Sequence, residues 1–366
     1  MNRTPDRTLL ILTVTLVIIG FCIFSSASLG LLARETARFS SVALNQVVFG
    51  IIGGGLSLFI MSIIHYRWWR QYAFYIFIGT LILTCLVFAP VIGFSHGGAT
   101  RWLKIGSFSF QPSEILKLGF VIYIATWLSG MKPQIHLFFK GTLPFLGLLV
   151  VAGVPLLMQP DTDTYLIMVA SALAMFITAG GRYRDVFLMF TTGVLLVAIL
   201  ALTRPYIRDR IDTFINPSHD PQGSGYQINQ SLIAVGSGGI MGRGFGQSIQ
   251  KFEYLPEPIG DSIFAVYAEE FGFVGTVFLL FLFMGFTLRG YRVASHAPDL
   301  FGMLLVVGII TMIIAQVFLN IAAMVALAPL SGLPLPFISH GGTALLVLLT
   351  AVGIVLSVSR NQRKTT

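Results

Sequence analysis

The sequence predicts an all-α polytopic integral membrane protein with about ten transmembrane helices and one long extracytoplasmic loop between spans seven and eight. Of its 366 residues, 55% are hydrophobic and only 10% are charged, whereas soluble domains carry roughly a quarter charged residues. The mean hydropathy is +0.84. A soluble fold of this size could not hide so much apolar surface. The composition therefore excludes a water-soluble protein.

About ten apolar stretches are long enough to cross a bilayer at about 1.5 Å of helix rise per residue. We place them at approximately 8–32, 43–64, 72–92, 112–130, 142–159, 163–181, 185–203, 262–288, 300–327 and 335–358. We expect the first stretch to be a retained helix and not a cleaved signal peptide, because it is long and many spans follow it. The stretches together predict a single membrane domain over residues 1–366.

Short basic turns lie between alternate pairs of these stretches, at 65–70, 131–140, 181–184 and 289–292. The positive-inside rule places such turns in the cytoplasm. An even number of spans then puts both termini there as well. Basic residues beside spans face anionic lipid headgroups, which explains the net charge of +8. We therefore expect no nucleic-acid partner.

The opposite side of the membrane carries two long connections, 93–112 and about 204–261. The second is much longer than a usual connector, which favours a functional role. The polar side chains that are costly near a membrane gather on this side: Trp102, Lys104, Glu114, Asp161, Arg208, Arg210, Asp261 and His340. A transporter would place charges near the midplane, in broken helices of two related halves, and no such pairing is evident. We therefore predict an extracytoplasmic site.

Asp261 lies where the long loop ends and the eighth apolar stretch begins. An acid at a helix start commonly caps free N–H groups and complements the helix dipole, so capping is one interpretation. The other is a carboxylate beside a low-dielectric region, where burial can raise its basicity. The helix N–H groups would lower the pKa of Asp261 and its apolar neighbours would raise it, so the sequence leaves the direction open.

Charged residues also stand at the outer ends of the fourth and sixth stretches. Glu114 and Lys117 are three residues apart, so they share one helical face and can pair. One interpretation is a structural salt bridge. The other is that Lys117 faces a polar cavity and meets an anion there, because intramembrane charges usually face protein or water. Asp161, which follows Gln159 and Pro160, has turn capping as its plain interpretation.

Two segments have a backbone that suits a site. The glycine-rich stretch 236–248 can offer backbone N–H groups to phosphate, but it matches neither a P-loop nor a dinucleotide fingerprint. The stretch 332–343, with Ser339 and His340, is interrupted by prolines and glycines. Such backbone at membrane depth is tolerated where it is buried in protein or lines a cavity. A lone histidine is more often structural than catalytic.

These motifs, in this order, resemble the SEDS family (shape, elongation, division and sporulation) of the FtsW/RodA/SpoVE type. The matching segments span nearly the whole chain: 26–28, 98–103, 111–114 with Lys117, 159–161, 226–227, 230–231, 242–246, 255–257 with Asp261, 269–270 and 332–342. The short N-terminus is typical of RodA. The opening span and the stretch Leu-Pro-Phe-Ile-Ser look more like FtsW, so we favour the cell-division type. Asp163, Gly260 and His340 stand where the family often has glycine, threonine or asparagine, and tyrosine.

The resemblance implies a peptidoglycan glycosyltransferase. Such an enzyme polymerises lipid II into glycan strands on the outer face of the bacterial cytoplasmic membrane and releases undecaprenyl pyrophosphate, for cell division or elongation. Asp261 aligns with the family's essential aspartate and is the predicted catalytic residue. The predicted substrate-binding residues are Lys117, Glu114, Trp102, Lys104, Arg208, Arg210, Asp161, Glu257, Ser339 and His340, with Arg243 and Lys251 as further candidate cations. A class B penicillin-binding protein, which is a transpeptidase, is the implied membrane partner, alongside other division or elongation proteins.

The chemistry of the residues agrees with this reaction. A pyrophosphate leaving group needs its charge neutralised and the acceptor hydroxyl needs one base, whereas glycoside hydrolases need two carboxylates. Arginine suits pyrophosphate through its planar fork. No cofactor is firmly implied, although a divalent cation, Mg²⁺ or Mn²⁺, can share that task. Two alternatives stay open: a flippase or other transporter of lipid-linked precursors, and a non-catalytic scaffold for a transpeptidase.

Overall fold

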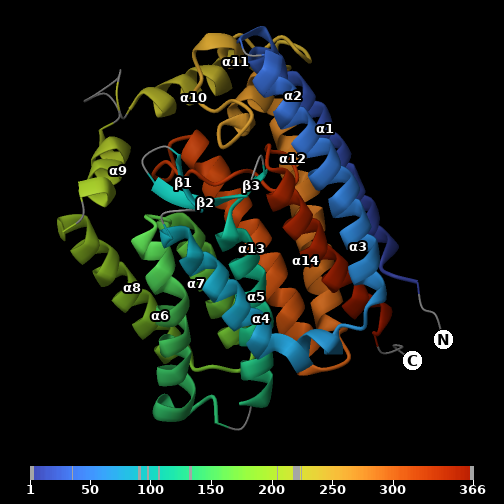
Figure 1. Ribbon diagram of the computed structural model, residues 1–366, viewed down its shortest axis with the longest axis vertical. Helices are drawn as coiled ribbons and strands as arrows, with labels where there is room; N and C mark the ends of the chain where they lie inside the picture. The colour runs from blue at the N-terminus through green and yellow to red at the C-terminus, as the bar shows by residue number, and fades with distance from the viewer. Residues whose placement is uncertain are drawn as a thin grey trace.

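The computed structural model describes residues 4–34, 36–89, 92–96, 99–105, 108–131, 134–203, 205–216, 223 and 225–362. Of the segments named above, positions 90–91, 97–98, 106–107, 132–133, 204, 217–222 and 224 lie outside these residues. Helices dominate the described chain, and they follow the apolar stretches of the sequence (Figure 1). The prediction of an all-α membrane protein is confirmed.

Each of the ten predicted spans coincides with helical structure. In chain order the helices are α1 (Arg7–Arg34), α2 (Thr36–Asn45) with η1 (Gln46–Gly53) and α3 (Gly54–Ile63), α4 (Arg67–Cys85) with η2 (Leu86–Phe88), α5 (Pro112–Gly130), η3 (Phe138–Thr142) with α6 (Leu143–Met158), α7 (Thr162–Thr178), α8 (Tyr183–Thr203), α12 (Ile263–Ser295), α13 (Leu300–Met324) and α14 (Gly342–Arg360). Among the described residues, seven helices are long and apolar enough to cross a membrane, and α7 is a shorter apolar helix. The protein is therefore multi-pass, and the number ten stays a prediction.

The last span begins later than the sequence predicted. The predicted start was residue 335, but α14 begins at Gly342. Residues 335–341 are not helical, and Phe337 takes a φ of 67° there. The physical reason lies in the sequence, because Pro336 removes a backbone donor and the pair Gly341-Gly342 weakens a helix. Leu335 and Phe337 are nevertheless buried, as the interpretation of a broken segment enclosed by protein requires.

The start of α1 and the end of α14 meet at one end of the bundle (Figure 1). The backbone N–H of Asp6 donates to Ser359 Oγ at 3.0 Å. The Asp6 carboxylate also pairs with Arg289, which belongs to a predicted basic turn, at 2.8 Å. Helices α10 (Tyr226–Ser237) and α11 (Gln250–Glu253) lie at the opposite end. This arrangement agrees with an even number of crossings.

The connection 93–112 is not an irregular loop. It folds into a three-stranded antiparallel sheet of β1 (Gly93–His96), β2 (Ala99–Ile105) and β3 (Phe108–Phe110), in the order β1-β2-β3. Leu103 pairs with Gly93 on one side and Phe110 on the other, and its side chain is buried. The long loop carries α9 (Pro205–Ile215) as well as α10 and α11. Both long connections therefore contain folded structure.

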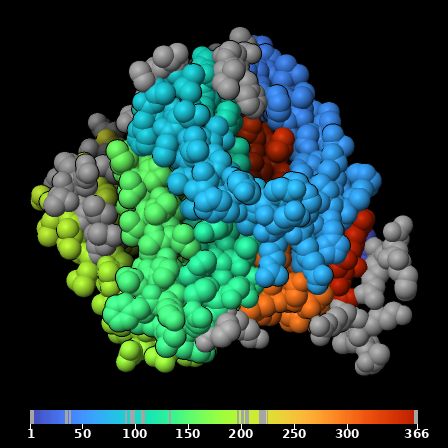
Figure 2. All heavy atoms as spheres, turned by 60° about the horizontal axis from the view of Figure 1, so that its bottom comes forward, coloured from blue at the N-terminus to red at the C-terminus, as the bar shows by residue number. Residues whose placement is uncertain are grey.

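Helix α13 lies at the centre of the bundle. Of its apolar window, 72% is buried inside the protein, the largest share among the candidate spans in the described residues. It packs against α5, α7 and α12, as expected for a helix that is apolar on nearly all sides. In Figure 2, red atoms of the C-terminal part of the chain lie recessed in a hollow between blue and blue-green segments.

Candidate active site

Asp261 lies two residues before α12, which begins at Ile263 with Ser262 as its N-cap residue. The N-cap side chain, that of Ser262, makes no capping hydrogen bond, and the backbone N–H groups that act on the Asp261 carboxylate are its own and that of Ser262, so capping by Asp261 stays an interpretation. Its Oδ2 accepts a hydrogen bond from Gln227 Nε2 at 3.3 Å. Its Oδ1 is buried and has no hydrogen-bond partner in the described part of the chain. Asp261 is thus a carboxylate with one oxygen held by Gln227 and one buried oxygen without a hydrogen-bond partner among the described residues.

Burial decides the direction that the sequence left open. The enclosed position raises the pKa of Asp261 to about 6, against the opposing effect of the Gln227 hydrogen bond. The negative charge of Glu257 adds to this rise. Desolvation therefore outweighs the effects that lower the pKa, which are the Gln227 hydrogen bond and the backbone N–H groups of Asp261 and Ser262. A carboxylate with this pKa is mostly ionised at pH 7, yet it is much more basic than an exposed aspartate.

Asp261 opens onto a cavity of about 300 Å³. Its lining comes from the long outer loop, from the start of α12 and from the segment after α13: Asp209, Arg210, Thr213, Gln227, Asp261, Leu330, Ser331 and Gly332. The cavity therefore brings together the predicted base, Asp261, and one predicted cation, Arg210. Arg208 does not line it. Its exposed side chain pairs with Asp212 at 3.6 Å.

Ser339 and His340 contact the Asp261 segment through its backbone. Ser339 Oγ donates to the carbonyl of Gly260 at 2.6 Å, and the backbone N–H of His340 donates to the carbonyl of Ile259 at 2.8 Å. The His340 ring stacks on Phe24 at a centroid distance of 5.9 Å. The predicted proximity of both residues to Asp261 is therefore correct, but these contacts are structural.

A second, smaller cavity of about 30 Å³ lies beside Lys117. Lys117 Nζ is 3.0 Å from Glu114 Oε1, and both side chains are nearly unexposed. Lys117 Nζ also donates to Gln316 Oε1 at 2.8 Å. Ser339 and His340 line the same cavity. The predicted pairing of Glu114 with Lys117 is confirmed, and the lysine does face a cavity.

Five predicted binding residues line neither cavity: Arg208, Glu257, Asp161, Trp102 and Lys104. Asp161 is buried at the start of α7, where its Oδ2 accepts from Ser113 Oγ at 3.1 Å and from Gln111 Nε2 at 3.2 Å. It makes no side-chain cap of α7, so the turn-capping interpretation is wrong, and its contacts join α7 to α5. Trp102 and Lys104 lie on β2, and Lys104 Nζ sits 5.4 Å from the centroid of the Phe94 ring.

The glycine-rich stretch does not present a free phosphate cradle. Helix α12 is interrupted at Gly272, where φ is 64° and ψ is −162°. The interruption leaves carbonyls without helical partners. The N–H of Arg243 donates to the carbonyl of Glu269 at 3.0 Å, and the N–H of Gly244 donates to that of Glu270 at 2.9 Å. The stretch therefore completes a broken helix, since these backbone donors are already engaged.

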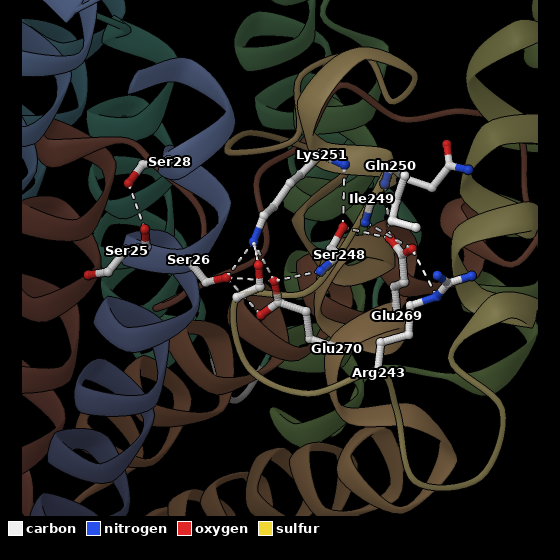
Figure 3. Close-up of polar contacts among 11 residues, drawn as sticks. Ser25, Ser26, Ser28, Arg243, Ser248, Ile249, Gln250, Lys251, Glu269 and Glu270 are labelled. Atoms are coloured by element: carbon white, nitrogen blue, oxygen red, sulfur yellow. Dashed lines mark hydrogen bonds and ion pairs between the residues drawn. The ribbon is translucent and has the colours of Figure 1, made fainter. Parts of the chain in front are cut away.

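Lys251 and Glu270 form a buried ion pair within the same region (Figure 3). Lys251 Nζ lies 2.7 Å from Glu270 Oε1, and neither side chain is more than 1% exposed. Lys251 Nζ also donates to Ser26 Oγ of α1 at 2.9 Å. Lys251 is thus enclosed and neutralised, so the prediction that it serves as a cation for pyrophosphate is wrong.

Glu269 forms the other half of this network (Figure 3). It accepts from Ser248 Oγ at 2.5 Å and from the N–H of Ile249 at 3.1 Å. Arg243 Nε lies 3.4 Å from Glu269 Oε1. Arg243 therefore has a structural partner, although its side chain is 39% exposed. The paired acids tie the outer loop to α12.

Comparison with known proteins identifies the family. The model of the FtsW/RodA/SpoVE family, described as "Cell cycle protein", matches residues 7–364. The chain belongs to the FtsW/RodA/SpoVE family. The resemblance that the motifs indicated is confirmed, and it covers both cavities and the broken helix α12.

The relatives of this FtsW/RodA/SpoVE member carry several names. Stage V sporulation protein E of Bacillus subtilis is 40% identical, with 99% of each chain covered. A probable peptidoglycan glycosyltransferase FtsW of Geobacter sulfurreducens is 38% identical, with 97% of this chain and 95% of the relative covered. Sporulation and division relatives are thus similarly close, and the division type stays a prediction.

Solved structures show the same fold. A chain from a study of polymerization and crosslinking by a peptidoglycan synthase complex matches with a TM-score of 0.80 at 25% identity, covering 98% of both chains. The rod shape determining protein RodA of Thermus thermophilus matches with a TM-score of 0.71 at 26% identity, again over 98% of both chains.

The sequence alone did not predict a role for the side-chain amides of Gln227, Gln316 and Asn320, which hold the site residues in place. Gln227 belongs to the matching segment 226–227, and Gln316 and Asn320 lie within the apolar stretch 300–327. A signal was present, because Gln316 and Asn320 are polar residues four apart in a membrane helix, and such residues usually mark a functional interior. Asp209 and Thr213 of the cavity lie in the amphipathic α9 and gave no comparable signal.

Proposed function

We propose that this chain is a peptidoglycan glycosyltransferase that polymerises lipid II and releases undecaprenyl pyrophosphate. One observation carries the proposal: the cavity that opens from the outer loop holds a carboxylate, Asp261, of raised basicity beside a guanidinium, Arg210. The names of the FtsW relatives and the solved peptidoglycan synthase complex support it. The reaction needs one base and at least one cation, and both are present in the cavity.

Asp261 acts as the general base in this proposal. Its ionised carboxylate accepts the proton of the acceptor hydroxyl while that oxygen forms a bond to the anomeric carbon of the donor sugar. The bond from the anomeric carbon to the pyrophosphate oxygen breaks, and the electron pair leaves with undecaprenyl pyrophosphate. General base catalysis of this kind is worth roughly 10²–10⁴-fold in rate. A pKa of about 6 leaves the group ionised at neutral pH and basic enough to take the proton.

Arg210 neutralises the departing pyrophosphate. Its guanidinium lines the cavity with Asp261, while Asp163 holds it at 2.8 Å. The planar fork of arginine matches phosphate oxygens. Lys117, in the neighbouring cavity, is the second cation proposed for the lipid phosphates, and Gln316 orients its ammonium group.

A divalent cation fits this site only in part. No group of three or more His, Cys, Asp or Glu side chains within the described ranges could hold a metal ion. The carboxylates at the Asp261 cavity are those of Asp261 and Asp209. Mg²⁺ is often held by one or two carboxylates together with substrate phosphates, so these two residues would hold it once the pyrophosphate is present. Such an ion would neutralise phosphate charge.

We propose the bacterial cytoplasmic membrane as the location, with both termini in the cytoplasm and the Asp261 cavity outside. The ends of α1 and α14 lie opposite the loop helices, which supports this orientation. We also propose lipid II as substrate and a class B penicillin-binding protein as partner. The proposed transpeptidase partner is supported by one of the similar structures, which comes from a study of polymerization and crosslinking by a peptidoglycan synthase complex.

The test is the purified chain mixed with lipid II in detergent or vesicles. Glycan strands on a gel, absent with Asp261→Asn, are the expected result. Movement of lipid II between leaflets without strands would instead favour the transporter alternative. Strand formation only in the presence of an active partner polymerase, and unaffected by Asp261→Asn, would favour the scaffold alternative.

A further inference from the structure

Three consecutive backbone carbonyls lead up to the Asp261 side chain, and each accepts a hydrogen bond from the same neighbourhood. The carbonyl of Ile259 accepts from the N–H of His340, and the carbonyl of Gly260 accepts from Ser339 Oγ. The carbonyl of Asp261 itself accepts from Asn320 Nδ2 at 2.7 Å. The segment is therefore fastened at every residue, although it lies outside any helix.

Asn320 is the most deeply placed of these donors. Its side chain is completely buried in α13, and its Nδ2 donates to the carbonyl of Leu333 at 2.8 Å as well as to that of Asp261. One amide group thus joins three separate parts of the chain: α13, the start of α12 and the segment that precedes α14. The buried Asn320 amide uses its Nδ2 in both bonds, whereas its Oδ1 has no hydrogen-bond partner among the described residues. Because a buried amide group is costly unless it is hydrogen-bonded, the two bonds of Nδ2 fix how this side chain is placed.

Gln316 lies one helical turn before Asn320, on the same face of α13. Its Nε2 donates to the carbonyl of Pro334 at 2.8 Å, and its Oε1 accepts from Lys117 Nζ at 2.8 Å. The two amides therefore bind adjacent carbonyls, those of Leu333 and Pro334. Asn320 Nδ2 also binds the carbonyl of Asp261, and Gln316 Oε1 binds Lys117. Asp261 and Lys117 line two different cavities.

We propose that Gln316 and Asn320 are positioning residues, which fix Lys117 and the Asp261 backbone relative to one another through the segment 333–334. This inference deepens the proposed function and rests on it, because it assigns how the base and a cation keep their spacing. Helix α13, which carries Gln316 and Asn320, is the most buried of the candidate spans in the described chain. Asp261 lies at a loop end and Lys117 on α5. A base must be held close to its productive position, and small misplacements lower the rate steeply.

The first test is the full-length variant Asn320→Leu, which keeps the size of the side chain and removes both donors. Lipid II polymerisation is measured between pH 5 and pH 8.5. We expect kcat to fall by about ten- to a hundredfold, with a much smaller change in KM. Loosening the segment admits water to Asp261. The apparent pKa on the acid limb of the pH–rate profile should therefore move from about 6 towards the ordinary aspartate value of 3.8. The charged groups around Asp261, which are Glu257, Asp209 and Arg210, are unchanged in this variant.

Thr311→Val is the matched control. Thr311 also lies on α13, and its hydroxyl contacts Tyr291 at 3.0 Å, away from both cavities. It should leave kcat and the acid limb unchanged. Ser339→Ala, which removes the bond to Gly260 and leaves that of Asn320 in place, should move the acid limb in the same direction by a smaller amount.

A second measurement does not need activity. Hydrogen–deuterium exchange of the peptide over 257–263 should quicken in Asn320→Leu and stay unchanged in Thr311→Val. If Asn320→Leu does not purify as folded protein, Asn320→Ser and Ser339→Ala take its place in both measurements. Unchanged kcat, acid limb and exchange in the folded variants would overturn the inference. If the wild type makes no glycan strands, the proposed function fails. The exchange measurement then decides the inference by itself. Unchanged exchange in Asn320→Leu would overturn it, and faster exchange would support the role of Asn320 in fixing the segment.

Discussion

Arg210 Nη1 lies 2.8 Å from Asp163 Oδ2, and this ion pair joins the helix of the outer loop, α9, to the first turn of α7. The two side chains are 22% and 13% exposed, so water screens the pair less than it screens a surface pair. The Asp163 carboxylate therefore holds the arginine that lines the Asp261 cavity.

Asp163→Asn should loosen Arg210 and weaken substrate binding. We expect KM for lipid II to rise about three- to tenfold, as for the loss of about 1 kcal/mol, with kcat changed much less. The matched control is Asp212→Asn, because Asp212 pairs with the exposed Arg208 at 3.6 Å and such pairs contribute little. An equal effect of both variants would show that Asp163 has no special role.

Asp261→Asn should remove polymerisation and raise stability at the same time. At neutral pH we expect a loss of roughly 10²-fold or more in kcat, in protein that purifies like the wild type. Activity within a few-fold of wild type would overturn the assignment and direct attention to Glu257.

The stability half of this prediction follows from the raised pKa. Folding raises the pKa of Asp261 from 3.8 to about 6, so the folded state binds the proton more tightly, and this contribution to stability is lost as pH rises through 6. The asparagine variant does not have this loss. Its Tm should exceed that of the wild type at pH 8, and the difference should shrink towards pH 5. A difference that does not depend on pH would contradict the buried-carboxylate interpretation.

Lys117→Met should slow polymerisation in folded protein by about tenfold or more, because it removes a cation that borders a cavity. Glu114→Gln is the comparison, since it alters the partner at 3.0 Å and leaves the cation in place. Strand formation and thermal unfolding are measured for both variants. If both lower Tm and folded Lys117→Met polymerises normally, the pair is only a structural salt bridge.

Lys251→Met should destabilise the protein strongly, because it leaves Glu270 buried without its cation. Removing one partner of such a pair costs about 3–5 kcal/mol. The double variant Lys251→Met with Glu270→Gln should recover much of the loss. Arg243→Met is the control, because its side chain is 39% exposed and should matter far less. Thermal unfolding in detergent checks all three, and no recovery in the double variant would contradict the account.

Cysteine labelling tests the orientation. In a background that lacks Cys22 and Cys85, Gln247→Cys should react with an impermeant reagent in intact cells, because Gln247 is exposed at the loop end of the bundle. Arg184→Cys, in a predicted cytoplasmic turn and 76% exposed in its side chain, should react only after permeabilisation. Labelling of Arg184→Cys in intact cells, with protection of Gln247→Cys, would show that the topology is the reverse of the one proposed.

Hydropathy and turn composition were enough to place the helices, because a bilayer demands long apolar stretches whatever the packing inside. They missed the sheet 93–110, because strands as short as β1 and β3 leave no comparable signal in a hydropathy pattern. They also misjudged residues 335–341, where an apolar composition hid a non-helical backbone that precedes the start of α14 at Gly342. Pairing across the chain, such as that of Ser26 with Glu270, has no local pattern at all.

The site was predicted unevenly for the same reason. Asp261 stood out because it lies at the junction of the long loop and an apolar stretch, which the sequence alone shows. Glu114 and Lys117 stood out because helical spacing joins them. Lys251 resembled a site cation in sequence, yet the fold pairs it with Glu270. The amide of Asn320 gains its meaning only when α12 and the segment before α14 come together around α13.

The break in α12 constrains how this protein can diverge. A side chain at Gly272 would collide with the backbone nitrogen of Gly242, and one at Gly242 would collide with the carbonyl of Glu270. Both glycines also have positive φ, which other residues adopt at a cost. The outer stretch around Gly242 and the helix around Gly272 therefore pack so closely that each requires glycine in the other. A chimera that takes the one from a relative must take the other with it.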